Sequence, residues 1–195
     1  MSAVPAVLVI GSAGSGKSTV AAAIARALRA AHLDKDDIAD RFTGALLTAN
    51  GEEAGARDGS QFYVETVRPL EYSTLLALTS TNLRNGVPVV LDAPFGAYFT
   101  DPQYIARARA EGGWPEETRP VVVRVSASAE TTRRRLIERG LDRDRWKLEH
   151  WDEFWASLGD ARPRWRGVPI IEVTNDEDGR SAERAREVLE QLQSL

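Results

Sequence analysis

The sequence predicts an α/β fold, a three-layer α/β/α sandwich around a five-stranded parallel sheet. Five short, mostly apolar segments have the composition of strands buried on both faces, and stretches of helical composition separate them. A loop rich in glycine joins the first strand to the first helix. With 195 residues the chain is long enough for one well-formed core, so we expect a single domain spanning residues 1–195.

The first strand is expected at residues 6–10, a continuous apolar run rich in β-branched side chains. The helix after the glycine-rich loop is predicted at 19–31, because that stretch contains Ala, Leu and Arg without Gly or Pro. The next apolar piece is very short and ends in several carboxylates. We expect a short second strand there, with Asp36 and Asp37 at its carboxyl end.

Residues 44–60 contain four glycines and little periodicity, which predicts a long loop that either acts as a lid or is mobile. A helix is expected over 61–84, and Arg68-Pro69 should kink or split it because proline removes a hydrogen-bond donor. The later elements follow the same alternation of strand and helix. They are strands at 87–92, 120–125 and 168–173, and helices at 101–112, 128–139, 146–158 and 181–195.

Composition limits the class of protein. At 43% hydrophobic and 28% charged residues the chain has ordinary globular composition, and no apolar run approaches the roughly 18 residues that span a bilayer. The absence of cysteine excludes disulfides and thiol catalysis, and fits a cytoplasmic location. The net charge of −4 argues against a general nucleic-acid-binding surface. Oligomeric state cannot be read from the sequence.

Residues 11–18, GSAGSGKS, match the phosphate-binding pattern G-x-x-x-x-G-K-[ST] in full. Glycines let backbone N–H groups surround phosphate oxygens, and the following helix directs the positive end of its dipole at the same charge. Lys17 would contact the β- and γ-phosphates of ATP, and the Ser18 hydroxyl would ligate Mg²⁺. The expected nucleotide contacts are Gly11, Ser12, Ala13, Gly14, Ser15, Gly16, Lys17, Ser18 and Thr19.

Two carboxylates are expected near this loop, at the carboxyl edge of the sheet. Asp92 ends the 87–92 strand and would hold Mg²⁺ or a water bound to it, although a turn residue is the simpler alternative. Asp36 would end the second strand, nineteen residues after Lys17. A carboxylate facing the γ-phosphate can orient an attacking hydroxyl and accept its proton. A helix cap is the alternative explanation for Asp36.

The combination of GSAGSGKST, LDKDD and RRRLIERGLDRD resembles the P-loop kinases that phosphorylate hydroxyl groups, the AAA_33 group with the chloramphenicol phosphotransferase, zeta toxin and 5′-polynucleotide kinase relatives. The resemblance covers the nucleotide half of the chain well and the acceptor half poorly. It implies that Asp36 is the base toward the acceptor hydroxyl, while Asp34 and Asp37 remain alternatives. The residues Ile38-Ala39 stand where some relatives place a basic residue, so the resemblance does not transfer acceptor recognition.

The same resemblance implies roles for three arginines and a lid at about residues 139–146. Arg135 would flank the adenine, Arg139 would contact the transferred phosphates, and Arg143 would be a second lid cation. A solvated basic helix face is the alternative explanation for Arg139. Thr174 and Asn175, after the last strand, would pass near the adenine. The chain lacks an NKxD motif, which favours ATP over GTP.

The function predicted from these features is transfer of the γ-phosphate of ATP, with Mg²⁺, to a hydroxyl of a small metabolite or antibiotic-like acceptor. Lys17, Asp36, Arg139 and Arg143 would be the catalytic residues, and Ser18 and Asp92 would hold the metal. Tyr63 and Arg68 either border the acceptor or lie on a helix surface. The alternatives are a polynucleotide 5′-hydroxyl kinase, which the acidic composition disfavours, and a non-catalytic ATP-binding switch.

Overall fold

The computed structural model describes residues 4–57, 59–158 and 162–194. It confirms the predicted sheet: five strands, all parallel, in the spatial order β2-β3-β1-β4-β5. The strands are β1 (Val4–Ile10), β2 (Ala31–Asp34), β3 (Val89–Asp92), β4 (Thr118–Ser126) and β5 (Ile170–Thr174).

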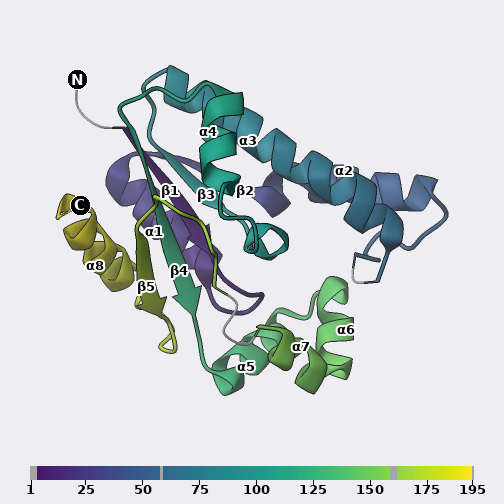
Figure 1. Cartoon of the computed structure of the whole chain (residues 1–195). Coiled ribbons are helices and arrows are strands. Elements are labelled where there is room, and N and C mark those ends of the chain that lie inside the picture. Colours follow the sequence, from purple (N-terminus) through teal and green to yellow (C-terminus); the bar gives the residue numbers. More distant parts are fainter. Residues whose placement is uncertain (1–3, 58, 159–161, 195) are drawn as a thin grey trace.

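Helices cover both faces of this sheet, as Figure 1 shows. The α-helices of the described chain are α1 (Lys17–Leu28), α2 (Lys35–Ala49), α3 (Arg68–Arg84), α4 (Tyr104–Gly112), α5 (Ala129–Arg139), α6 (Arg145–Glu149), α7 (Trp151–Leu158) and α8 (Ser181–Gln193). Helices α1 and α8 pack on one face against the valines of β1, β4 and β5. Helices α3 and α4 pack on the other face, where Tyr72, Phe95, Tyr104 and Trp165 form an aromatic cluster.

The carboxyl ends of the strands lie at one edge, and the chain passes there into its polar loops. The loop after β1 precedes α1, α2 follows β2 directly, and Asp92 is the last residue of β3. Helices α5, α6 and α7 lie beyond this same edge, at the lower end of the molecule in Figure 1. A parallel sheet therefore brings residues far apart in sequence to one surface, where doubly wound folds bind ligands.

Several predicted boundaries were wrong, including the helix expected at 19–31, which spans Lys17–Leu28. Strand β2 ends at Asp34, whose side chain accepts a hydrogen bond of 2.8 Å from the Asp36 N–H and so caps α2. Asp36 and Asp37 therefore lie in the first turn of a helix and not at a strand end. Helix α2 also continues to Ala49, so residues 44–49 are helical and only the later part of the expected 44–60 loop connects α2 to the next helix.

Another correction concerns residues 146–158, which form two helices. Helix α6 ends at Glu149, the backbone of its C-cap His150 leaves the helical region at φ −115° and ψ 47°, and α7 begins at Trp151. Helix α4 begins at Tyr104, three residues beyond the expected start at 101. Before it, Asp101 accepts a hydrogen bond of 3.0 Å from the Gln103 N–H. Ser128 caps α5 as predicted, accepting from the Thr131 N–H.

The predicted irregularity at Arg68-Pro69 is confirmed as a π-helical turn, η1 (Tyr63–Val67), which runs directly into α3. The Arg68 N–H donates to the Tyr63 carbonyl, five residues earlier. Pro69 cannot donate to the carbonyl four residues before it, and its ring crowds that carbonyl, so regular α-helical bonding cannot pass through this turn. The widened turn fixes the direction in which Tyr63 and Arg68 leave the helix.

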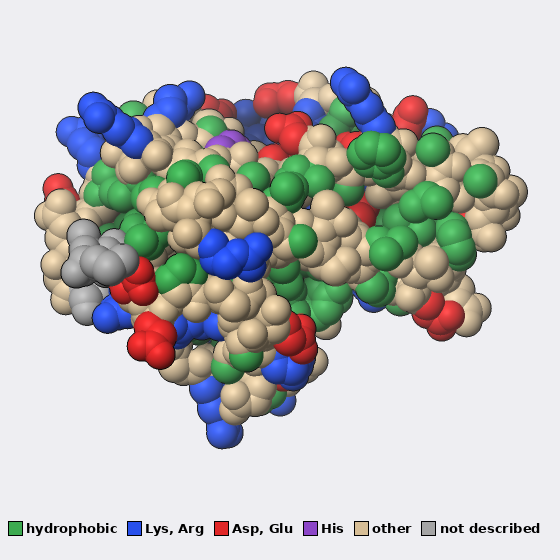
Figure 2. Space-filling view, turned by 90° about the horizontal axis from the view of Figure 1, so that it is seen from above, with side chains coloured by type: hydrophobic (Ala, Val, Ile, Leu, Met, Phe, Trp, Pro, Cys, Tyr) green, Lys and Arg blue, Asp and Glu red, His purple; other side chains and the backbone are tan. Residues whose placement is uncertain are grey.

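Figure 2 shows the face at the amino ends of the strands. On this face Lys and Arg side chains are scattered among Asp and Glu and do not gather into one continuous basic surface. Among the described residues, no helix combines the length and the apolar composition needed to cross a bilayer.

Candidate functional site

The loop between β1 and α1 has the backbone of a phosphate cradle. Gly14 and Gly16 adopt φ of 81° and 82°, a region that side chains disfavour. A Cβ on Gly16 would lie 2.3 Å from Nδ2 of Asn175, and a Cβ on Gly14 would lie 2.9 Å from the Thr132 carbonyl oxygen. Both positions therefore require glycine for conformation and for space. Inside the loop, the Ser15 hydroxyl donates to the Ser12 carbonyl at 2.9 Å.

Helix α1 begins at Lys17 and has no acidic residue in its first turn. Its N-cap is Gly16, which offers no side chain to the first N–H groups of the helix. These N–H groups and the positive end of the helix dipole favour an anion at this point. The predicted phosphate loop thus has the local geometry that the motif implies.

Lys17 and Asp92 form an ion pair next to this loop. The Lys17 Nζ lies 3.7 Å from Asp92 Oδ1, and the Asp92 side chain is fully buried. Burial alone would raise the pKa of Asp92, but His32, Lys17 and the Ser18 hydroxyl outweigh it, so the net shift is downward. Asp92 is therefore held as a carboxylate next to the phosphate loop, as a metal-binding role requires.

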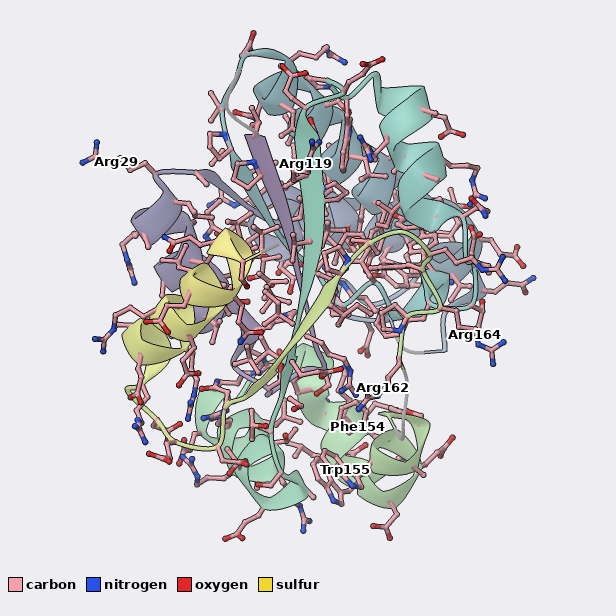
Figure 3. The ribbon with its side chains drawn as sticks, turned by 60° about the vertical axis from the view of Figure 1, so that its left-hand side comes forward. Arg29, Arg119, Phe154, Trp155, Arg162 and Arg164 are labelled. Carbon is pink, nitrogen blue, oxygen red and sulfur yellow. The ribbon has the colours of Figure 1, made fainter. Side chains whose placement is uncertain are left out.

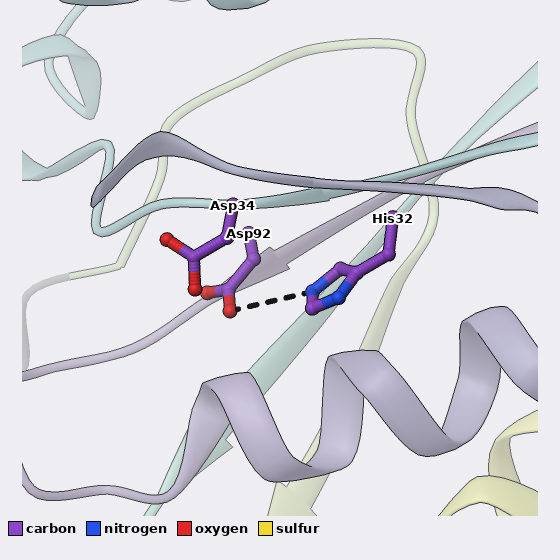
Figure 4. A group of neighbouring side chains, drawn as sticks. All are labelled: His32, Asp34 and Asp92. Carbon is purple, nitrogen blue, oxygen red and sulfur yellow. Dashed lines mark ion pairs between the residues drawn. The ribbon is translucent and has the colours of Figure 1, made fainter. Parts of the chain in front are cut away.

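Asp34 and His32 complete a cluster around Asp92, drawn in Figure 4. Ligand atoms of the three side chains lie within 4.8 Å of one another, and His32 Nε2 is 3.6 Å from Asp92 Oδ2. Burial and the neighbouring Asp92 raise the pKa of Asp34 to about 6. The adjacent Asp92 carboxylate raises the pKa of His32.

These residues fit a hard divalent cation. Both carboxylate oxygens of Asp92 are buried without a hydrogen-bond partner among the described residues. Two adjacent carboxylates and a hydroxyl are the oxygen ligands that Mg²⁺ takes in nucleotide sites. Sequence reasoning assigned Ser18 and Asp92 to the metal, and the structure adds Asp34 as a neighbour of Asp92.

Asp34→Asn is expected to separate the effect of the Asp34 carboxylate on folding stability from its effect on Mg²⁺ binding. Because the folded-state pKa lies above the ordinary value, the protonated carboxyl favours folding, and this contribution is lost as the pH rises through about 6. At pH 8 without metal, Asp34→Asn should therefore raise Tm by about 2–4 °C, roughly 1 kcal/mol after discounting for solvent exposure. Asparagine also keeps the helix cap.

The same variant should lose the additional Tm increase that MgCl₂ gives over ADP alone. Asp37→Asn, an exposed change in the same helical turn, is the matched control. An equal Mg²⁺-dependent increase in wild type and Asp34→Asn would contradict a metal role for this carboxylate. Differential scanning fluorimetry of each protein, with ADP alone and with ADP plus MgCl₂, gives the comparison.

Asp36 extends from the first turn of α2 and is partly exposed. Its Oδ1 lies 2.9 Å from the Lys35 Nζ and 3.4 Å from Nη1 of Arg57. Two cations at these distances favour the ionised form of a carboxylate. The residue expected to act as base therefore lies between two cations, although it reaches this position from a helix.

A buried network anchors the two cations beside Asp36. Glu71 of α3 is 3% exposed, and its Oε2 lies 2.9 Å from the Lys35 Nζ. The Tyr63 hydroxyl donates to the same oxygen at 2.9 Å, and the Thr43 hydroxyl donates to Oε1 at 2.6 Å. Arg57 also pairs with Glu71 at 3.7 Å and with Asp40. The Glu71 network, defined by these residues, joins α2, α3 and the connection between them.

The segment at residues 139–146, which the sequence predicted to be a lid, contains two predicted site arginines, and the structure describes the side chain of one of them. Arg139, the last residue of α5, donates from Nε and Nη2 to the two oxygens of Asp144 at 2.6 and 2.7 Å. Asp144 is 1% exposed, in the short helix η3 (Asp142–Asp144), and Lys147 lies 3.8 Å from it. The side chain of Arg143 lies outside the described part of the structure.

Arg135 and Asn175 pack against the phosphate loop. Nη1 of Arg135 donates to the Ser15 carbonyl at 3.3 Å, and Nδ2 of Asn175 donates to the same oxygen at 2.9 Å. Asp178 accepts from Nε and Nη2 of Arg135 at 3.0 and 2.7 Å. Thr174 is exposed at the end of β5. These two side chains therefore support the loop from the side on which the adenine is expected.

One cavity of about 290 Å³ brings the predicted groups together. Lys17, Asp36 and Arg139 all line it, and so do Tyr63 and Arg68, the two residues whose contact with the acceptor the sequence left open. We call it the acceptor cavity. Pro94 and Gly96, from the turn after β3, form another part of its wall. Lys17, Asp36 and Arg139 come from three different elements, so the cavity is a product of the tertiary fold.

Sequence reasoning missed Lys35, Arg57, Glu71, Asp144 and Lys147. Their roles depend on pairs up to 36 residues apart, as in Lys35 and Glu71. Nothing in the local pattern around Glu71 separates it from an exposed helical glutamate. Only Lys35, between two predicted site residues, carried a signal, since a lysine flanked by carboxylates is a natural partner for either.

The fold and the site together define a P-loop nucleotide-binding protein with the architecture of the small kinases. A family model, AAA_33 (AAA domain), matches residues 7–160. The chain belongs to this family, which confirms the resemblance seen in its motifs. No curated protein matches the sequence.

Solved structures of kinases share the fold over nearly the whole chain. A sugar kinase from Janibacter sp. HTCC2649 has a TM-score of 0.60 at 15% identity, covering 97% of this chain and 95% of its own. Shikimate kinase from Bacteroides thetaiotaomicron has a TM-score of 0.58 at 20% identity, covering 98% and 99%. A gluconokinase from Sinorhizobium meliloti has 0.57 at 18%, covering 100% and 96%. At such identities the likeness shows the fold alone.

Proposed function

We propose that the protein is an ATP- and Mg²⁺-dependent kinase that phosphorylates a hydroxyl group of a small metabolite. The observation that carries this proposal is that the phosphate-loop lysine and the carboxylate of Asp36 line one cavity of about 290 Å³. That volume is near the lower end of the range for small-molecule sites. The kinases of similar fold, named for sugars, shikimate and gluconate, support an acceptor of this size.

Each group has a defined task in this proposal. The loop N–H groups and Lys17 bind the β- and γ-phosphates, and Mg²⁺ held by Ser18, Asp92 and Asp34 would neutralise phosphate charge. Asp36 orients the acceptor hydroxyl and accepts its proton as the bond to the phosphorus forms. Arg139 and Arg143 stabilise charge on the transferred group from the lid side. Arg135 and Asn175, with Thr174 beside them, border the nucleotide base.

The proposal includes a means of excluding water, which depends on closure of the predicted lid. In the structure Arg139 is paired with Asp144, which lies in the segment expected to be the lid. An anionic phosphoryl group would compete with Asp144 for the guanidinium, so lid closure and phosphate binding would be linked. A kinase needs such closure because an open site would transfer the phosphoryl group to water.

The decisive experiment is transfer of γ-labelled phosphate from Mg·ATP to separate panels of hydroxylated metabolites, antibiotics and 5′-hydroxyl oligonucleotides. We expect label in a small-molecule panel, abolished by EDTA. Label in the oligonucleotides would favour the polynucleotide kinase alternative. Nucleotide binding with no labelled acceptor and only slow hydrolysis would favour the ATP-binding switch.

A further inference from the structure

Arg68 differs from the other cations of the acceptor cavity. Lys17, Lys35, Arg57, Arg139 and Lys147 each lie within 4 Å of at least one carboxylate. Arg68 lines the same cavity and is only partly exposed, but its guanidinium forms no ion pair or hydrogen bond with any residue that the structure describes. The cavity wall therefore contains a guanidinium that the described carboxylates leave unmatched.

The position of Arg68 is well defined. It is the first residue of α3, directly after the π turn and before Pro69, whose ring restricts the backbone. Its charge reaches the Tyr98 phenol, where it opposes the burial that raises the pKa of that group. Tyr72, a buried residue that also lines the cavity, accepts a hydrogen bond of 3.0 Å from the Phe95 N–H at its hydroxyl oxygen.

The neighbouring cations are already matched. Lys35 and Arg57 share Asp36, Asp40 and Glu71, so no net positive charge remains in the Glu71 network for a ligand. Lys17 and Arg139 face the phosphates of the nucleotide in the proposed function. Arg68 is therefore the cation of the cavity wall that remains available to bind an acceptor.

We propose that Arg68 binds an anionic oxygen group, a carboxylate or a phosphate, on the acceptor whose hydroxyl faces Asp36. The guanidinium presents only donors, in a planar fork that matches two oxygens of such a group. The preferred substrate is then a small hydroxylated acid or a phosphorylated hydroxyl compound. This inference rests on the proposed function, because it names the substrate class of that same site.

The test uses acceptors in matched charged and neutral pairs. One series contains polyhydroxy carboxylic acids with their uncharged amides, and the other contains polyol monophosphates with the parent polyols. Wild type should show a kcat/KM about 10- to 100-fold higher for the charged member of one series, the value of a charge-assisted bidentate contact. The series that responds identifies the anionic group as carboxylate or phosphate.

Arg68→Gln should raise KM for the charged acceptor by a similar factor, with a much smaller change in kcat, and should reduce the preference for charge. Arg68→Lys should restore part of it, because lysine keeps the charge but lacks the fork. Arg29→Gln is the matched control. Arg29 is exposed at the end of α1 and points away from the molecule in Figure 3, so this variant should behave as wild type.

Two results would overturn the inference. One is a wild type that does not distinguish the members of either series, and the other is an equal fall in kcat/KM for charged and neutral acceptors in Arg68→Gln, which would indicate a structural role. If wild type labels no acceptor at all, the proposed function fails separately. In that case, calorimetry with the same anionic compounds tests the anion site at Arg68. Binding to wild type that is lost in Arg68→Gln supports this site, and no binding to wild type rejects it.

Discussion

Asp36→Asn is expected to lower kcat for phosphoryl transfer by roughly 10²- to 10⁴-fold, the range for loss of a general base. The amide has nearly the shape of the carboxylate and can still accept a hydrogen bond from a hydroxyl, so KM for the acceptor should change little. What it loses is the ability to take the proton. The amide also leaves Lys35, which lies 2.9 Å from Asp36, with less compensation on that side.

Initial rates at saturating Mg·ATP, with the labelled acceptor from the transfer experiment, give the comparison. Asp37→Asn is the matched control, since Asp37 is the next residue of the same helical turn and is exposed. Wild-type rates in Asp36→Asn would reject the assigned base. A fall confined to Asp37→Asn would move the role to that residue, and a fall in Asp34→Asn that excess Mg²⁺ does not relieve would move it to Asp34.

Glu71→Ala is expected to destabilise the protein by about 3–5 kcal/mol, the range for removing one partner of a buried ion pair. The Glu71 side chain is 2% exposed, and Lys35 beside it is 6% exposed. Without Glu71, the Lys35 ammonium and the hydroxyls of Tyr63 and Thr43 lose a shared acceptor in a desolvated site. For a chain of this length the change corresponds to a fall in Tm of about 6–20 °C.

Urea unfolding followed by circular dichroism measures the loss. Glu65→Ala is the matched control, because Glu65 lies in the adjoining π turn and is exposed, with only a hydrogen bond from Gln61 at 3.0 Å. Its effect should stay within about 0.5 kcal/mol. A double variant, Lys35→Met with Glu71→Leu, should recover most of the lost stability, since it removes the buried charge as well as its partner. Equal effects of Glu71→Ala and Glu65→Ala would show that the buried network contributes nothing.

The sequence predicted the sheet and the phosphate loop well because both are encoded in contiguous residues. Runs such as residues 6–10 and 120–123 are apolar throughout, and a strand buried on both faces suits them. The loop motif likewise specifies its own backbone, as the positive φ of Gly14 and Gly16 confirms. The structure brings Lys17, Asp36 and Arg139 to one cavity, but their catalytic roles stay predictions until rates are measured.

Other parts depend on interactions that the local pattern does not contain. The start of α2 at Lys35 depends on Asp34 acting as its cap, and several consecutive carboxylates made that boundary ambiguous. Gly44 suggested a loop, yet helix α2 continues through it because tertiary packing outweighs the helix propensity of one glycine. The Glu71 network joins side chains from separate elements, so its existence follows only from the fold.

The π turn before Arg68 has a consequence for comparing this chain with its relatives. A π turn contains one residue more than the α-helical turn it replaces, and each residue of a helix turns the chain by about 100°. Deleting Thr66 would remove the extra residue of this turn and rotate Tyr63 away from Glu71 by that angle, which would break their hydrogen bond of 2.9 Å. An alignment across this turn therefore needs a one-residue gap for any relative whose helix is regular. Without the gap, every position before Arg68 in the helix would be matched to the wrong side chain.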